Sequence, residues 1–207
     1  MHILSGPAFL AAWTMYSEDP RARYTAAVVA ALYLLRLLSV GRRGRAAVDG
    51  DARAAAPVEV ATLSRGGGAD ELLRGPLYYT AVIAFTVLQF WRTPTGVAIL
   101  SFMCAGDGLA DVVGRRWGAE ARLPFNPEKS WAGSAAMFLG GAAVSLVFSY
   151  VYAHLGYFEM DGGRYASLVA MAAIATVVEA LPTKNGLDDN ISVPLVTAVL
   201  GFLLLPS

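Results

Sequence analysis

The chain has 207 residues, of which 56% are hydrophobic and 15% charged, and its mean hydropathy is +0.51. This composition is too apolar for an ordinary soluble domain and is typical of a protein with several membrane spans. Acidic and basic residues balance to a net charge of zero, which by itself says little. We expect no nucleic-acid partner. The single cysteine, Cys104, excludes internal disulfides and a cysteine metal cluster.

Apolar runs long enough to be candidate membrane helices follow one another along the chain, given that about 20 residues cross a bilayer core. They are residues 3–15 (a short run), 24–40, 76–91, 95–113, 131–155, 165–181 and 191–206. The runs are continuous rather than alternating, which favours helices over strands. We therefore predict an all-α, polytopic transmembrane helical bundle of six to seven spans, forming a single domain over residues 1–207. The low-complexity stretch at 41–70 predicts a flexible loop, and Glu71 to Pro76 predict a short helical turn.

The distribution of Lys and Arg predicts the orientation of the bundle. Because the spans alternate in direction, one membrane face receives the N-terminus and the loops at 41–74, 114–130 and 182–190. That face carries twelve basic residues, counting Arg36 at a helix end, and the opposite face carries four. By the positive-inside rule, the face with twelve is cytoplasmic, or stromal in a plastid.

Unexpected polar residues gather on this same face. Asp107 and Asp111 are four residues apart and so lie on one side of a helix, near the basic end of their span. The other members are NPEKSWAG at 126–133, Glu179, and LDDN at 187–190. Ionisable groups at membrane depth are costly and usually belong to a site. Carboxylates are suitable ligands for Mg²⁺. Lysine and arginine can bind phosphates, and glycine lets backbone N–H groups approach phosphate oxygens closely. We therefore predict a nucleotide and metal site that is not a P-loop.

The segments GDGLADVVGRRWG, LPFNPEKSWAGSAAMFLGG, VVEALP and DDNISVP together resemble the phytol kinase and polyprenol (dolichol) kinase family. ELLRGPLYY and FWR are similar to its phytol kinase branch. The resemblance covers most of the chain except the low-complexity loop. It implies phosphoryl transfer from CTP, or in some members UTP, to the primary hydroxyl of a long isoprenoid alcohol that enters from the membrane lipid. For phytol this reaction salvages the alcohol toward tocopherol, which implies a chloroplast membrane, with the endoplasmic reticulum as the alternative.

The resemblance and the chemistry of phosphoryl transfer together suggest residue roles. Asp107 and Asp111 would hold Mg²⁺ on the nucleotide phosphates, and Lys129 would clamp a phosphate. Further nucleotide contacts would come from Gly106, Gly108, Gly114, Arg115, Arg116, Asn126, Ser130 and Gly133. The acceptor side would comprise Glu179, Asp188, Asp189 and Asn190, with one carboxylate as general base, and the sequence leaves open which one.

The start of the chain departs from the family pattern. Family members carry an Arg-Lys pair just before a sequence resembling HILSG at 2–6, whereas here Met1 directly precedes His2. We therefore expect the N-terminus to be truncated. His2 falls on the face that carries the motifs and is included among the candidate catalytic residues.

Other interpretations stay open at this point. A CTP-dependent phosphatidate cytidylyltransferase has a similar Gly-Asp element followed by a Lys-Ser/Thr-Trp element, although its usual C-terminal motif is missing from this sequence. A non-catalytic membrane protein is a third class. The alternative interpretation of Lys129 is a snorkelling cation at the start of a helix, and that of Asp188 and Asp189 is a cap at the N-terminus of the last helix. His154 is expected on the opposite face as an interfacial residue.

Overall fold

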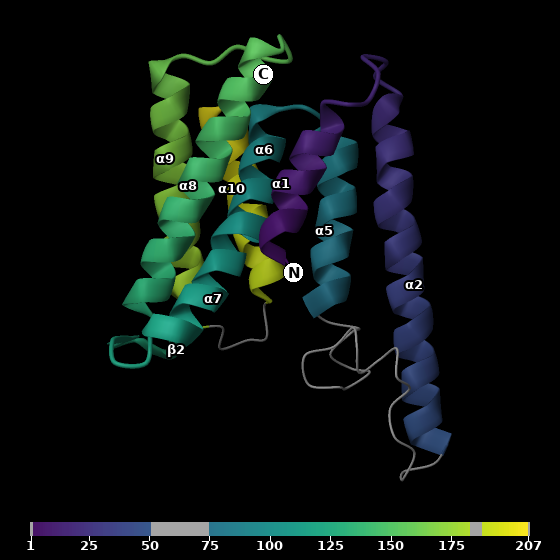
Figure 1. Cartoon of the computed structure of the whole chain (residues 1–207), viewed down its shortest axis with the longest axis vertical. Coiled ribbons are helices and arrows are strands. Elements are labelled where there is room, and N and C mark those ends of the chain that lie inside the picture. The colour runs from purple at the N-terminus through teal and green to yellow at the C-terminus, as the bar shows by residue number, and fades with distance from the viewer. Residues whose placement is uncertain (1, 51–74, 183–187, 207) are drawn as a thin grey trace. The chain divides into compact units, whose positions relative to one another are not determined.

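The protein is described from a computed structural model that covers residues 2–50, 75–182 and 188–206, without the side chains of His2 and 46–50. The described part is almost entirely helical, as Figure 1 shows. Its elements are α1 (His2–Trp13), α2 (Ala22–Gly50), α5 (Gly75–Gln89), α6 (Pro94–Leu100), the π-helix η1 (Ser101–Gly106), α7 (Asp107–Trp117), β1 (Arg122–Leu123), β2 (Asn126–Ser130), α8 (Trp131–His154), α9 (Gly162–Ala180) and α10 (Asp189–Leu204).

Four helical stretches have the length and apolar composition needed to cross a membrane. They are Ala22–Arg45, Pro94–Trp117, Trp131–His154 and Gly162–Ala180, and the shorter apolar helices are Ile3–Trp13 and Asp189–Leu204. The second stretch is continuous because α6, η1 and α7 follow one another without a break. The predicted all-α membrane bundle is confirmed, and each predicted run corresponds to a helical segment.

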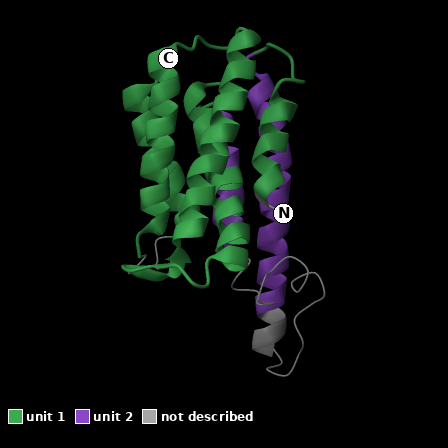
Figure 2. Cartoon of the chain, turned by 60° about the vertical axis from the view of Figure 1, so that its left-hand side comes forward, with its two compact units in different colours: residues 1–19, 89–207 green, residues 20–88 purple. Residues whose placement is uncertain are grey.

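The chain divides into two compact units, which Figure 2 shows in different colours. Unit 1 comprises residues 1–19 and 89–207, and unit 2 comprises residues 20–88. Helix α2 of unit 2 continues to Gly50, so the loop expected from residue 41 was placed too early. The apolar pattern ends near residue 40, but Arg and Ala, which form helices well, carry the helix further. The rest of that loop and most of the turn predicted at 71–76 lie outside the described residues.

Unit 1 is held together by a core of apolar side chains from several helices. Its members are Ala98, Phe102, Ala110, Met137, Ala142, Leu168, Met171, Ala172, Ala175, Val193 and Leu205. Helix α8 packs against η1, α7 and α9, while α10 packs against α6 and α9. Four helices of the unit begin at a capping side chain, and one of these, Ser130, accepts a hydrogen bond from the Gly133 N–H at 3.1 Å. Such caps satisfy N–H groups that have no partner within a helix.

A short antiparallel hairpin of β1 and β2 connects α7 to α8. Arg122 pairs with Ser130 and Leu123 with Asn126, with an irregularity between the two pairs. Leu123, Asn126 and Ser130 are buried, so the hairpin is anchored to the bundle. We expected only a loop at 114–130, and that expectation was wrong because α7 extends to Trp117 and the hairpin fills most of what remains. The strands are too short for their alternation to be detected against an apolar chain.

Candidate functional site

Lys129 of β2 joins two other elements through its ammonium group. Its Nζ donates to Glu179 Oε1 near the end of α9, and to Asp189 Oδ2 at the start of α10 at 2.8 Å. The Glu179 side chain is 4% exposed, whereas those of Lys129 and Asp189 are 25% and 27% exposed. Glu179 and Asp189 are 50 and 60 residues from Lys129 in the sequence. Packing therefore assembles this ion-pair triad at one end of unit 1.

The backbone near the triad is fixed by polar side chains that make bonds within the protein. Asn126 is buried: its Nδ2 donates to the Ala180 carbonyl oxygen at 3.1 Å, and its Oδ1 accepts from the Glu128 N–H at 3.2 Å. This brace ties β2 to the end of α9 and so sets Lys129 opposite Glu179. Asp188 caps α10 by accepting from the backbone N–H and the side-chain Nδ2 of Asn190, at 2.9 and 2.6 Å. The cap orients the first turn of α10, which carries Asp189.

The electrostatics of the triad favour a permanently charged lysine. Burial by itself lowers the pKa of the Lys129 ammonium, but the Glu179 carboxylate and the hydrogen bonds to Asp189 and Glu179 raise it more strongly. The pKa of Lys129 therefore stands above its ordinary value, because the two carboxylates stabilise the charged form. At neutral pH the group is a fixed cation able to attract a phosphate oxygen.

Asp107 and Asp111 lie on α7, which begins at Asp107. Asp107 is half-buried and interacts electrostatically with Lys129, Glu179, Asp189 and Asp111. Asp111 accepts a hydrogen bond from Arg115, which is largely exposed. The structure thus brings Asp107 to the triad from a fourth element, while Asp111 lies one turn further along α7.

A π-helix directly precedes Asp107. Its six residues, Ser101–Gly106, are all buried, and α1 and α8 both pack against it. A π-helix widens the helical turn and shifts the side chains that follow, and such elements often occur beside functional sites. Apolar periodicity gives no signal for it, because the run at 95–113 reads as one uninterrupted helix.

The four predicted phosphate-contacting glycines lie where helices meet. A Cβ on Gly108 would come within 2.6 Å of Ile3 Cγ1, so α1 packs directly over this residue. A Cβ on Gly133 would lie 3.1 Å from the Ala110 carbonyl oxygen, where α8 crosses α7. Gly106 and Gly114 also lie at the contact between the α6–α7 span and α8. These glycines permit close helix packing, and their contact with a nucleotide stays a prediction.

The other predicted residues are distributed around the same end of unit 1. Ser130 is the α8 cap, and the Arg116 guanidinium lies 5.3 Å from the centre of the exposed Trp117 ring. His2 begins α1, and its side chain lies outside the described residues. Its neighbour Ile3 packs on Gly108, so the start of α1 is next to Asp107.

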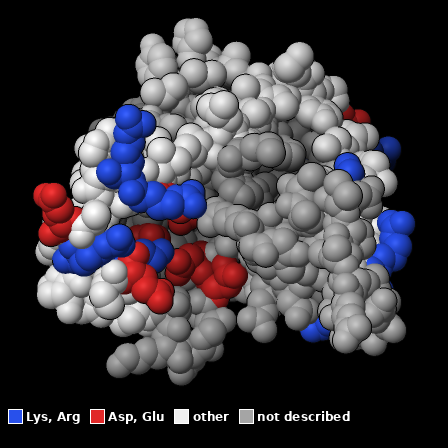
Figure 3. Space-filling view, turned by 60° about the horizontal axis from the view of Figure 1, so that its bottom comes forward, with Lys and Arg blue, Asp and Glu red and all other residues white. Residues whose placement is uncertain are grey.

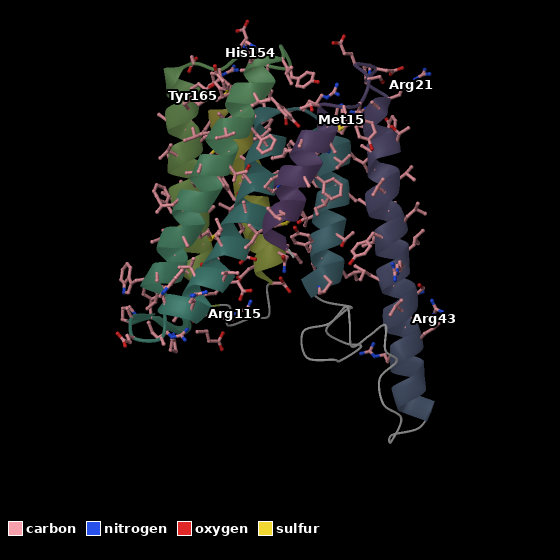
Figure 4. All side chains as sticks on the ribbon, in the orientation of Figure 1. Met15, Arg21, Arg43, Arg115, His154 and Tyr165 are labelled. Atoms are coloured by element: carbon pink, nitrogen blue, oxygen red, sulfur yellow. The ribbon has the colours of Figure 1, made fainter. Side chains whose placement is uncertain are left out.

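Two views display this arrangement. Figure 3 shows acidic and basic side chains gathered together at one end of unit 1, and Figure 4 places Arg115 at that end and His154 at the other. The predicted convergence of the polar segments on one face is therefore confirmed within unit 1 by the contacts of Lys129. Among the described residues, no group of three or more His, Cys, Asp or Glu side chains is arranged to hold a metal ion by itself.

Comparison with known proteins gives one consistent result. The chain is 45% identical over its whole length to a probable chloroplastic phytol kinase of Zea mays, and 42% identical over 98% of its length to phytol kinase 1 of Arabidopsis thaliana. The chain belongs to the phytol kinase family. A chloroplastic farnesol kinase of Arabidopsis thaliana is 36% identical over 99% of the chain.

The chain spans 64 to 66% of the length of these three proteins, slightly less than two thirds. No family model and no solved structure matches the chain. The assignment to the family therefore rests on the sequence similarity to these plant kinases.

Proposed function

We propose that this protein transfers the terminal phosphoryl group of a nucleoside triphosphate, CTP, to the hydroxyl of a long-chain isoprenoid alcohol, phytol, in a chloroplast membrane. UTP is the second donor to test. The observation that carries the proposal is the triad of Lys129, Glu179 and Asp189 at the end of an apolar bundle. The names of the relatives, which are phytol and farnesol kinases of the chloroplast, support the same reaction.

Phosphoryl transfer depends mainly on positioning and on neutralising phosphate charge. Lys129 supplies a cation held rigidly between two carboxylates, which suits a clamp on the transferred group. Arg115 and Arg116 lie at the exposed end of α7 and are available for the outer phosphates. Glu179 is buried against Lys129 and fixes its position rather than contacting substrate.

Mg²⁺ fits the residues present. Asp107, Asp111, Glu179 and Asp189 supply four carboxylates against the two cations Lys129 and Arg115, which leaves two negative charges in excess when all are ionised. This excess negative charge would repel a triphosphate unless a divalent cation lay between the carboxylates and the phosphates. Mg²⁺ usually takes one or two protein carboxylates together with substrate phosphates, so Asp107 and Asp111 would hold it, and when bound it would neutralise phosphate charge.

The apolar exterior of unit 1 suits a substrate with a hydrocarbon tail. Large apolar side chains are exposed on α8, α9 and α10: Leu139, Val147, Tyr150, Val177, Leu195, Val199 and Phe202. In a bilayer these positions contact acyl chains, as expected for membrane-spanning helices. A tail dissolved in the same layer reaches the polar end of the bundle without leaving the membrane.

The decisive experiment uses CTP labelled at two different phosphates. Membranes containing the protein are incubated with Mg²⁺ and phytol, geranylgeraniol, farnesol, dolichol or phosphatidate. A kinase moves label from the γ-phosphate of CTP into a prenyl monophosphate, whereas a cytidylyltransferase moves label from the α-phosphate into a CDP-lipid. Labelled phytyl phosphate from γ-labelled CTP alone supports the proposal, and a CDP-lipid or no lipid product refutes it.

A further inference from the structure

Three carboxylates lie in the triad or next to it, but their hydrogen bonds give them different capacities to act on a substrate. Asp188 Oδ1 accepts from both nitrogen donors of Asn190 and caps α10. Glu179 is nearly inaccessible and accepts from Lys129. Asp189 uses only one of its oxygens, Oδ2, for Lys129 at 2.8 Å.

Within the described part of the chain, Asp189 Oδ1 is buried and has no hydrogen-bond partner, and the same is true of Ser192 Oγ. Both residues belong to α10 and are three positions apart, which makes them neighbours on its surface. A buried carboxylate oxygen and a buried hydroxyl oxygen without partners are costly, and such groups call for an explanation.

A bound alcohol would satisfy both oxygens. A hydroxyl group can donate its hydrogen to Asp189 Oδ1 and at the same time accept one from Ser192. The Lys129 ammonium lies 2.8 Å from the other Asp189 oxygen, so a phosphate held by Lys129 would be close to that hydroxyl. The acceptor hydroxyl would thus lie at one oxygen of the Asp189 carboxylate, and the phosphoryl group would lie near the other oxygen, beside Lys129.

Building on the proposed kinase function, we propose that Asp189 is the general base for the acceptor alcohol and that Ser192 orients the alcohol's hydroxyl group. The hydroxyl proton moves to Asp189 Oδ1 as the alcohol oxygen forms a bond to the γ-phosphorus. The bond from that phosphorus to the β,γ-bridging oxygen breaks, and the nucleoside diphosphate leaves with its electron pair. Asp189 then releases the proton to water.

The charges around Asp189 are consistent with this role. Lys129 of β2 faces it directly, and Glu179 of α9, Asp107 of α7 and Asp188 of its own helix are the nearby carboxylates. Lys129 holds Asp189 Oδ2 at 2.8 Å, which leaves Oδ1 as the oxygen that would accept a proton. Because Lys129 is shared with Glu179, replacing either carboxylate removes one partner of Lys129. Among the described carboxylates, only Asp189 has a buried oxygen without a hydrogen-bond partner.

Asp189→Asn and Glu179→Gln therefore form a matched pair. Each is assayed with dihydrophytol and with its 2,2-difluoro analogue, whose hydroxyl is more acidic and needs less help from a base. We expect Asp189→Asn to lower kcat for dihydrophytol by about 10²- to 10⁴-fold, the usual contribution of a general base. With the fluorinated acceptor the deficit should shrink by at least about tenfold, because the base is then less important.

The controls separate base catalysis from damage to the site. Glu179→Gln should show the same loss on both acceptors, and Ser192→Ala should raise the KM for the alcohol without changing the response to fluorination. Stabilisation by CTP in a thermal-shift assay checks that Asp189→Asn still folds and binds nucleotide. If it does not, Asp189→Glu, which keeps a carboxylate, should retain activity and respond to fluorination as the unaltered protein does.

Any of three results would remove the base role while leaving the kinase proposal intact. They are an equal deficit of Asp189→Asn on both acceptors, near-normal turnover of that variant, and loss of activity in a folded Asp189→Glu. Absence of any prenyl phosphate from the unaltered protein would refute the proposed function itself, and the base role with it.

Discussion

Replacing Lys129 by Met tests the triad most directly, because Met keeps an unbranched side chain while it removes the charge. Glu179, 4% exposed, then loses its cation, and leaving a buried charge unpaired costs about 3–5 kcal/mol. The contact with Asp189 adds at most about 1 kcal/mol, since both partners are a quarter exposed. We therefore expect Lys129→Met to lower the free energy of unfolding by about 3–5 kcal/mol.

A compensating change separates the charge effect from lost packing. In Lys129→Met/Glu179→Gln the buried carboxylate is gone, so most of the stability should return, with a remaining deficit of about 1–2 kcal/mol for imperfect hydrogen bonding of the amide. Phosphoryl transfer should not return in this double variant, because the phosphate clamp is still missing. Arg122→Met is the matched control, since the exposed side chain of this hairpin cation donates to the Glu128 carbonyl oxygen at 3.2 Å. This change should alter stability by about 0.5 kcal/mol or less.

The assay is thermal unfolding in detergent, followed alongside γ-phosphate transfer from labelled CTP. For a chain of this size 1 kcal/mol corresponds to about 2–4 °C in Tm, so Lys129→Met should unfold roughly 6–20 °C lower. The raised pKa of Lys129 means that its contribution is complete below its ordinary value of 10.5 and declines only above it. The Tm difference should thus be constant from about pH 7 to 9. A double variant as unstable as Lys129→Met would refute the reasoning from buried charge.

Asp107→Asn should leave the protein in the membrane but lower phosphoryl transfer by about 100-fold or more and shift the Mg²⁺ titration to higher concentration, because an amide holds Mg²⁺ poorly; an unchanged titration would remove Asp107 from the metal site. Arg92→Lys should lower the free energy of unfolding by about 2–4 kcal/mol. The reason is that the buried guanidinium donates to the carbonyl oxygens of Trp13, Tyr16 and Ser17 at 2.5–3.1 Å. The control, His154→Ala at the same end of unit 1, should lower it by about 0.5 kcal/mol or less. Single cysteines at Ala119 and Gly162, in a Cys104→Ala background, should react with an impermeant maleimide from opposite sides of the membrane, and labelling of both from one side would refute the predicted orientation.

Much of the fold was predictable because its helices are set by local composition. The apolar run at 131–155 corresponds closely to α8, Trp131–His154, since bilayer thickness fixes how long an apolar helix must be. Two features gave no such signal. The π-helix before Asp107 has the same composition as its flanking turns, and the β1–β2 hairpin depends on burial of Leu123 and Asn126 against the bundle.

For the site, the sequence by itself predicted the candidate residues and a common membrane face, because connectivity and the positive-inside rule assign each loop to one side of the membrane. It could not determine contacts. That Lys129 meets Glu179 and Asp189, that Asp188 is a cap and that one oxygen of Asp189 lacks a partner all depend on how β2, α9 and α10 pack. Hydrogen bonds and ion pairs act over a few ångströms between residues 50 or more positions apart, so only the tertiary structure decides which carboxylate oxygens are paired and which are not.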